Sequence, residues 1–488
     1  MMTLRILTNI FFFLLFMGLC GCGPKGGPET LKYGEMKYTP PPLPPHRYTL
    51  DNGITAFVVE DKKLPVFDIL AVVRTGGLLE PQNRDGLAQI TSELLESGGT
   101  RGIPSDSLDE RIDFHAAVLS SGCDMVSATL SLSILSEKTD TGLTLFTEAL
   151  TRPAFEQKKL DLAKTRLREA VRHRFDHPKS TLQVAYDYAM YGKGRLSELI
   201  SEKEVNAMTR ADVERFYLLC YRPENLILAV SGRFETKEML EKLNATLGRW
   251  KRTGRPADAI PDPPMHFQRG LHFVEKDISQ AYIRMGLPAL KRPHPDYFSL
   301  AVMNYIFGGA PFVSRISKKI REEEGLAYSA GSSLGCGFFY RGHFNIYLET
   351  KSASAAYAVD LALREMKTFL DKGATEAELA DAKKSLIDAF PANFKTGEDV
   401  ASAFAYNQYY GRGDDYFDVY CDTIGAITLE DIRRVAGKYL KPDSMAVCMV
   451  GRWKECAEGD GTHPVKLADF GTFKRYTERE IEKDCLTP

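Results

Sequence analysis

Hydrophobic and polar positions alternate along several short stretches of the chain. Residues 127–135, SATLSLSIL, place apolar side chains at every second position, which predicts a strand with one buried face. Residues 57–73 and 273–287 also have alternating strand character, whereas residues 156–175 have helical period and strong helix formers. This mixture predicts an α+β fold, a sandwich in which helices cover one side of a mixed sheet.

The order of the elements is repeated. Residues 208–234 (MTRADVERFYLLCYRPENLILAVSGRF) align without a gap with residues 427–453, at an offset of 219 residues (427 minus 208). Each copy opens with a threonine and an acid three residues later, which signals a helix start. The stretches 57–73 and 273–287 repeat more weakly, at an offset of 216 (273 minus 57). A repeat of this length indicates two homologous domains.

The boundaries follow from the repeat and from the composition. We predict the two domains at residues 47–252 and 269–475. Residues 253–268 form the linker, which opens with the Pro- and Gly-rich TGRPADAIPDPP. Residues 476–488 form a tail.

The N-terminus has the pattern of an export signal. Arg5 is followed by an apolar run that is too short for a convincing spanning helix, and then by small residues and two cysteines. The letters LCGC resemble a bacterial lipobox, which makes residues 1–22 a signal peptide and Cys22 the lipidated residue, although Cys20 inside the box is unusual. The alternative is an ordinary cleaved signal with incidental cysteines. Residues 23–46 are rich in Gly and Pro and predict an extended tether.

These features predict a cell-envelope protein held by a lipid anchor. Gly23 after the cysteine, in place of aspartate, favours an outer membrane and its periplasmic face.

The chain is 44% hydrophobic and 26% charged with a formal net charge of −2, so nothing favours a nucleic-acid partner. Seven further cysteines include no CxxC pair, which argues against a thiolate zinc site, and the sequence assigns no disulfide.

One stretch near the start resembles a known family. Residues 85–100, DGLAQITSELLESGGT, together with two α+β halves and a Pro/Gly linker, are similar to the pitrilysin, insulinase and mitochondrial processing peptidase family. The resemblance extends from about residue 47 to 455 and implies the family's two-domain fold. Active relatives carry the inverted zinc motif HxxEH in the register GLAHFLEHMLFKGT, with two histidine ligands and a glutamate base.

This chain departs from that motif. Gln89 stands in place of the first histidine, Ser92 in place of the glutamate base, and Glu93 in place of the second histidine. Glu169 matches the third ligand, 76 residues after Glu93 (169 minus 93), while the usual acid seven residues earlier is Leu162. An amide, a hydroxyl and two carboxylates are poor substitutes for imidazole and cannot activate water in the same way. The resemblance therefore implies no zinc in this chain.

A relocated metal site is the alternative. Glu169, His173 and His177 follow at intervals of four, so an unbroken helix would place them on one face. Pro178 comes next and indicates that the helix frays or ends near His177. We therefore interpret these residues as a solvated helix end.

A second family signature is kept. Residues 308–333, GGAPFVSRISKKIREEEGLAYSAGSS, match the second-half motif that supplies an arginine and a tyrosine to the active site, here Arg321 and Tyr328. The resemblance implies that the hydroxyl of Tyr328 donates to the oxyanion of a scissile carbonyl and that Arg321 holds substrate oxygens.

Loss of the zinc motif with retention of the Arg/Tyr pair implies the non-catalytic subunit of a heterodimeric zinc peptidase. The partner would carry HxxEH and the zinc. Peptide substrates bind in this family as an added strand on a sheet edge, and residues 116–124 would lie in that region. Those residues lack the asparagine of active subunits. A stand-alone peptide-binding or assembly module and a hydrolase with a relocated metal are the alternatives.

Overall fold

The computed structural model describes residues 38–486. The predicted signal peptide, the lipidation site at Cys22 and most of the predicted tether lie outside the described residues. Residues 41–488 form one compact unit, which is described below as far as residue 486. Within residues 38–486, no helix combines the length and the apolar character that crossing a membrane requires.

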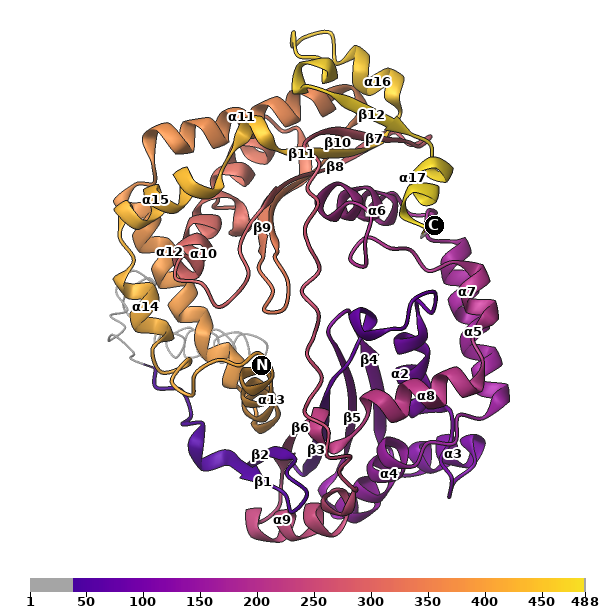
Figure 1. Ribbon diagram of the computed structural model, residues 1–488. Helices are drawn as coiled ribbons and strands as arrows, with labels where there is room; N and C mark the ends of the chain where they lie inside the picture. Colours follow the sequence, from indigo (N-terminus) through magenta and orange to yellow (C-terminus); the bar gives the residue numbers. More distant parts are fainter. Residues whose placement is uncertain (1–37, 487–488) are drawn as a thin grey trace, which may run out of the picture. The chain divides into compact units, whose positions relative to one another are not determined.

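The unit is built around two six-stranded mixed sheets (Figure 1). The first has the order β1-β2-β6-β3-β5-β4. Its strands are β1 (Arg47–Thr49), β2 (Thr55–Glu60), β3 (Val66–Arg74), β4 (Val118–Cys123), β5 (Ser127–Leu135) and β6 (Leu226–Gly232). The second has the order β12-β7-β11-β8-β10-β9. Its strands are β7 (Gly270–Glu275), β8 (Gln280–Pro288), β9 (Ala327–Gly335), β10 (His343–Lys351), β11 (Ala446–Gly451) and β12 (Phe473–Tyr476).

Helices connect and cover these strands. The first half contains α2 (Leu87–Ser97), α3 (Ser105–Phe114), α4 (Thr139–Thr151), α5 (Gln157–Arg172), α6 (Pro178–Tyr191), α7 (Glu202–Ala207), α8 (Arg210–Cys220) and α9 (Thr236–Ala245). The second contains α10 (Tyr297–Asn304), α11 (Ala355–Lys372), α12 (Glu376–Ala389), α13 (Gly397–Tyr409), α14 (Tyr420–Ala426), α15 (Leu429–Tyr439), α16 (Trp453–Glu458) and α17 (Glu478–Cys485). Two π-helical segments, η7 (Tyr305–Gly309) and η8 (Ser317–Glu323), follow α10.

The predicted α+β class with two homologous halves is confirmed. The strand predicted at 127–135 is β5, and the aligned stretches 208–234 and 427–453 contain α8–β6 and α15–β11. Both helices begin with the expected capping box, formed by Thr209 with Asp212 and by Thr428 with Asp431.

Alternation along the strands separates two faces of each sheet. In β11, Val447 and Met449 belong to the core of the second half, on the side of its own helices. Ala446, Cys448 and Val450 point to the opposite face and join a separate core cluster. Because successive side chains of a strand point to opposite faces, both faces of this sheet need a cover.

That opposite face is covered by a helix from the other half. Helix α6 contacts β11, β8 and β7 of the second sheet, and α13 contacts β6, β2 and β3 of the first (Figure 1). The two helices occupy equivalent places in the repeat, because they start 219 residues apart (397 minus 178). Each half thus lends one helix to the sheet of the other half, an arrangement that we call the helix exchange. The expectation that helices cover only one side of the sheet missed this second cover.

Polar contacts accompany the exchange. The Tyr186 hydroxyl on α6 lies 2.9 Å from Nδ1 of His343 on β10. Burial and the charge of Arg284 lower the pKa of His343 to about 4, so the ring is neutral at pH 7 and accepts this hydrogen bond. At the other site, the backbone N–H of Gly397 donates to Asp61 at 3.0 Å. Each exchanged helix is thus held by a polar contact as well as by apolar burial.

The four sheet edges differ in character. The outer edges are the short strands β1 (RYT) and β12 (FKRY), which carry charged side chains and come from outside the repeated core. The other two edges, β4 (VLSSGC) and β9 (AYSAGSSLG), contain no charged residue and no proline. Charges, prolines and short length are the usual protections of an edge strand, and β9 lacks all three. Strand β4 lacks charges and prolines, but α2 engages part of its backbone, because the N–H of Ser121 donates to Glu96 at 2.8 Å. The predicted docking stretch 116–124 includes β4.

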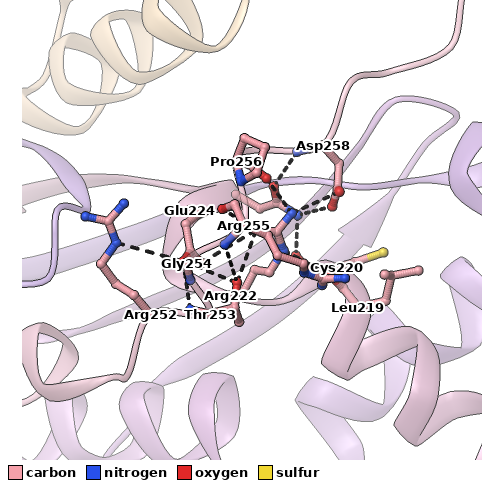
Figure 2. Close-up of polar contacts among 11 residues, drawn as sticks. Leu219, Cys220, Arg222, Glu224, Arg252, Thr253, Gly254, Arg255, Pro256 and Asp258 are labelled. Atoms are coloured by element: carbon pink, nitrogen blue, oxygen red, sulfur yellow. Dashed lines mark hydrogen bonds and ion pairs between the residues drawn. The ribbon is translucent and has the colours of Figure 1, made fainter.

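The start of the linker is fixed to the first half by a buried polar network, which Figure 2 shows. Arg222 is 2% exposed, and its guanidinium donates to the carbonyls of Arg255 and Pro256 at 3.1 and 2.8 Å. Glu224 accepts the backbone N–H groups of Thr253 and Gly254 at 2.7 and 2.8 Å. Residues 253–258 are therefore anchored to the first half. At the far end of the chain, the predicted tail, residues 476–488, contains α17, which contacts α6 and β7.

Candidate functional site

Helix α2 carries the three residues that stand at the motif positions. Its apolar residues are buried in the core of the first half, and Gly86 before it has a φ of +89°, which glycine adopts without strain. The carboxylate of Glu80 accepts the N–H of Ala88 at 2.7 Å and so caps the helix start. Burial raises the pKa of Glu80 to about 7.

The three side chains have separate environments. Gln89 is exposed. Ser92 is 2% exposed, and its hydroxyl donates to the carbonyl of Gly122 in β4 at 2.9 Å. Glu93 forms an ion pair with Arg166 of α5 at 2.9 Å. Ser92 therefore joins α2 to β4, and Glu93 joins α2 to α5.

Glu169 on α5 has partners of its own. Its carboxylate lies 3.0 Å from Arg172 and 3.5 Å from His173, and its side chain is half exposed. Leu162, seven residues earlier, is 43% exposed and offers no ligand atom. The carboxylates at positions 93 and 169 are thus both engaged by arginines.

This arrangement does not fit a zinc ion. The donor set would be an amide and two carboxylates, and the imidazole ligands of a catalytic zinc site are missing. The guanidinium of Arg166 already places a positive charge against Glu93, so a divalent cation there would meet electrostatic repulsion. Among residues 38–486, no group of three His, Cys, Asp or Glu side chains is arranged to hold a metal.

The relocated-metal arrangement is not formed either. Helix α5 ends at Arg172, and His177 is the residue that precedes α6. His173 pairs with Asp176 at 2.7 Å, and this hydrogen bond raises the pKa of its imidazole. The turn between the two helices breaks the helical face that would have aligned these residues.

Arg321 and Tyr328 lie in the second half, in η8 and at the start of β9. The Tyr328 side chain is 87% exposed, and its hydroxyl makes no hydrogen bond with any residue that the structure describes. The guanidinium carbon of Arg321 lies 4.6 Å from the ring centroid of Phe312, and within residues 38–486 Arg321 makes no hydrogen bond or ion pair. Both polar groups are therefore free to bind another molecule.

The comparisons with known proteins agree with this fold. Residues 57–202 match the family model described as "Insulinase (Peptidase family M16)", and residues 207–386 match "Peptidase M16 inactive domain". The chain belongs to the M16 peptidase family.

Curated relatives include proteins with and without a peptidase name. The chain is 24% identical over 404 residues to the "Non-peptidase homolog YmxG" of Helicobacter pylori, which covers 81% of this chain and 91% of that protein. It is 20% identical to the "Uncharacterized zinc protease YmxG" of Bacillus subtilis, with 81% and 96% covered. The chain is thus an M16 member that lacks the zinc motif and is similar to a relative named as a non-peptidase.

Solved structures share the fold. A crystal structure of a peptidase M16 inactive domain from Pseudomonas fluorescens superposes with a TM-score of 0.75 at 22% identity, covering 83% of this chain and 97% of that one. A protease from Helicobacter pylori gives 0.71 at 20% identity, with 83% and 98% covered. At these identities the likeness establishes the architecture alone.

Sequence reasoning missed two residues of this region. Arg166 pairs with Glu93 across 73 positions, and Phe312 lies over Arg321. The helical period and the charged residues of α5 could indicate only that Arg166 lies on a polar face of that helix. For Phe312, the available signal was its place as an aromatic residue inside the second-half signature.

Proposed function

We propose that this chain is the non-catalytic subunit of a zinc peptidase made of two different chains. It supplies half of the substrate chamber together with Arg321 and Tyr328. The partner is a chain of the same family that carries HxxEH and holds the zinc, and this chain binds no cofactor of its own.

The observation that carries the proposal is the contrast between the two signatures. At the position of the zinc helix, Glu93 is neutralised by Arg166 and Ser92 is bonded to the backbone of β4. At the second signature, Arg321 and Tyr328 are accessible and have no polar partner among the described residues. A purely structural role explains the first arrangement but gives no reason for the second.

The chemistry of the pair suits a peptide substrate. A tyrosine hydroxyl that is not otherwise bonded can donate to the carbonyl oxygen of a scissile bond as negative charge develops there. A guanidinium without a carboxylate partner can bind a substrate carbonyl or carboxylate through two parallel N–H groups. Both contacts strengthen as the substrate oxygen gains charge, so they favour the transition state over the ground state.

The open edges support peptide binding. Strand β9 is an uncharged edge that can accept an extended strand through its backbone groups, and β4 can do so along the part that α2 leaves free. A cavity of about 360 Å³ lies beside β4, between the first sheet and α13. It is lined in part by Asp68, Val118, Ser120, Ser131, Ser133 and Glu398. The face of the sheet next to the edge is therefore both polar and hollow, as half of a peptide chamber requires.

The proposal places the protein in the cell envelope. Lipidation of Cys22 would anchor the chain to the periplasmic face of an outer membrane, and the Gly- and Pro-rich segment before Leu43 would hold the folded unit away from the lipid. Leu43 itself is 2% exposed and belongs to the folded unit, so the predicted tether is shorter than residues 23–46. Labelling with an alkyne-bearing fatty acid, with Cys22→Ser as the control, tests this part.

The first experiment is affinity purification of the tagged protein from its native cells in mild detergent, followed by mass spectrometry. Recovery of an HxxEH-bearing chain in equal amount supports the proposal. Recovery of the protein alone or with unrelated envelope proteins would favour a stand-alone peptide-binding or assembly module.

The purified pair then tests the roles of the two residues. Arg321→Ala and Tyr328→Phe should each lower cleavage of a mixture of internally quenched peptides by roughly 100-fold, the cost of losing one oxyanion donor, without loss of assembly. Arg479→Ala and Tyr347→Phe serve as matched controls, because both side chains are solvent-accessible and make no polar contact within residues 38–486. Normal cleavage by the Arg321/Tyr328 double variant would show that the assigned role is wrong.

A further inference from the structure

Phe312 has a backbone conformation that bulky residues avoid. Its φ is +68°, in the left-handed region, and it lies in the short loop between η7 and η8. An aromatic residue in this region is an outlier that persists only where the surroundings impose it. The Phe312 side chain is 56% exposed, so apolar burial offsets little of this strain.

The Phe312 ring is used instead to hold Arg321. The guanidinium carbon lies 4.6 Å from the ring centroid, well within the range of a cation–π contact. The carboxylates of Glu323 and Glu324, close in sequence, pair with Lys319 at 2.8 and 3.3 Å and leave Arg321 without a counter-ion. The ring is therefore the contact that fixes the guanidinium.

The other arginine of the same signature shows the contrast. Arg315 donates to Glu378 at 2.7 Å and to the carbonyl of Gly373 at 2.8 Å, and its side chain is 17% exposed. All of these partners belong to the second half, so Arg315 has a structural role. Arg315 also lies over a ring, with its guanidinium carbon 4.8 Å from the centroid of Phe369, so the difference between the two arginines is in their N–H groups. A ring contact alone orients the guanidinium of Arg321 and leaves its N–H groups free.

We propose that Phe312 is a positioning residue, which accepts backbone strain in order to direct the guanidinium of Arg321 toward a carbonyl or carboxylate oxygen of the bound peptide. This inference rests on the proposed function of Arg321. The strain remains because relieving it would release the arginine, and strained residues of this kind concentrate at functional sites.

Three substitutions separate positioning from structure. Phe312→Gly removes the ring and relieves the strain, because glycine adopts positive φ freely. Phe312→Ala removes the ring and keeps the strain, and Phe312→Tyr keeps both. Phe473→Ala, a half-exposed phenylalanine on β12, is the control for loss of an exposed ring.

In the purified two-chain complex, Phe312→Gly and Phe312→Ala should lower kcat/KM for the quenched-peptide mixture by similar factors of roughly 2 to 30, the range of a cation–π contact. Phe312→Tyr should retain activity. The Tm of Phe312→Gly should equal or exceed that of the natural protein, and the Tm of Phe312→Ala should be lower than both. Adding Phe312→Ala to Arg321→Ala should cause no further loss, because the ring acts through the arginine.

The outcomes are distinguishable. If Phe312→Gly lowers Tm together with activity, the ring is structural and the inference is wrong. Full activity of Phe312→Gly beside a strong loss in Arg321→Ala would also overturn it, while leaving the proposed function intact. If Arg321→Ala has no effect, the proposed function fails first and this inference fails with it.

Discussion

Replacing Arg222 tests the buried polar network that holds the start of the linker. Its Nη2 lies 2.9 Å from Asp258 and 2.8 Å from the carbonyl oxygen of Pro256, and its Nε donates to Leu219 at 3.1 Å (Figure 2). The side chain is 2% exposed, so solvent screens these contacts little. Arg222→Met keeps most of the apolar stem and removes the cation and its donors.

The expected cost can be worked from these contacts. Removing one partner of a buried charge network typically costs about 3–5 kcal/mol, because the remaining groups stay buried without compensation. Asp258 is 28% exposed and can recover water, and Glu224 keeps its backbone donors from the linker. For both reasons we expect a loss at the lower end of this range, about 3 kcal/mol in the free energy of unfolding.

The assay is urea unfolding followed by circular dichroism, together with a trypsin time course. Arg222→Met should lower the free energy of unfolding and should speed trypsin cleavage after Arg252, since the segment that follows this bond loses the guanidinium donors that hold the carbonyls of Arg255 and Pro256. Arg252→Met is the matched control, because its side chain is 59% exposed and its nearest carboxylate, Glu224, is 3.8 Å away. This control should change stability by less than about 0.5 kcal/mol.

An Arg222→Met protein within about 1 kcal/mol of the natural one would refute the reasoning, as would a loss no larger than that of Arg252→Met. Unchanged trypsin cleavage beside a large loss of stability would show that the linker is held by contacts other than Arg222.

Three further perturbations follow from other parts of the structure. Burial raises the pKa of Glu80 from its ordinary 4.5 to about 7, so the folded state binds the proton more tightly and stability falls as pH rises between these values. Glu80→Gln should therefore be more stable than the natural protein by about 3 kcal/mol at pH 8 and equal to it at pH 4. Equal unfolding curves of the two proteins at pH 8 would contradict the raised pKa of Glu80. A Cβ at Gly286 would lie 2.5 Å from the Tyr186 hydroxyl, so Gly286→Ala should lose about 2–3 kcal/mol in urea unfolding, whereas Gly437→Ala, in an open part of α15, should gain about 0.5–1 kcal/mol. Equal effects of these two variants would argue against close contact of α6 with the second sheet. Burial alone would raise the pKa of Asp296, but three hydrogen-bond donors of α15 outweigh it and hold the pKa well below its usual range. Asp296→Asn should thus cost about 2 kcal/mol at pH 7. This cost should shrink as pH falls below about 4, where Asp296 of the unfolded chain binds a proton while the folded carboxylate stays ionised; a cost independent of pH would refute the ionic account.

Local chemistry explains why much of the fold could be predicted. The alternation of 127–135 required one buried face, and the structure forms β5 over these same residues. The threonine caps at 209 and 428 satisfy helix-start N–H groups within three residues, so they act independently of the rest of the chain. The loss of the zinc ligands at positions 89 and 93 could likewise be read from residue identity alone.

The sequence by itself thus determined the elements, their repetition, the absence of imidazole ligands and the presence of the Arg321/Tyr328 signature. Only the tertiary structure decided which helix covers which sheet. A burial pattern shows that one face of a strand is covered, but it does not show which element covers that face. Helices α6 and α13 are equivalent in the repeat, yet each covers the sheet of the other half. The same holds for Arg166 beside Glu93 and for Phe312 over Arg321. Whether an arginine neutralises a carboxylate or stays free for a ligand depends on contacts made in space, and these form only when the chain is folded.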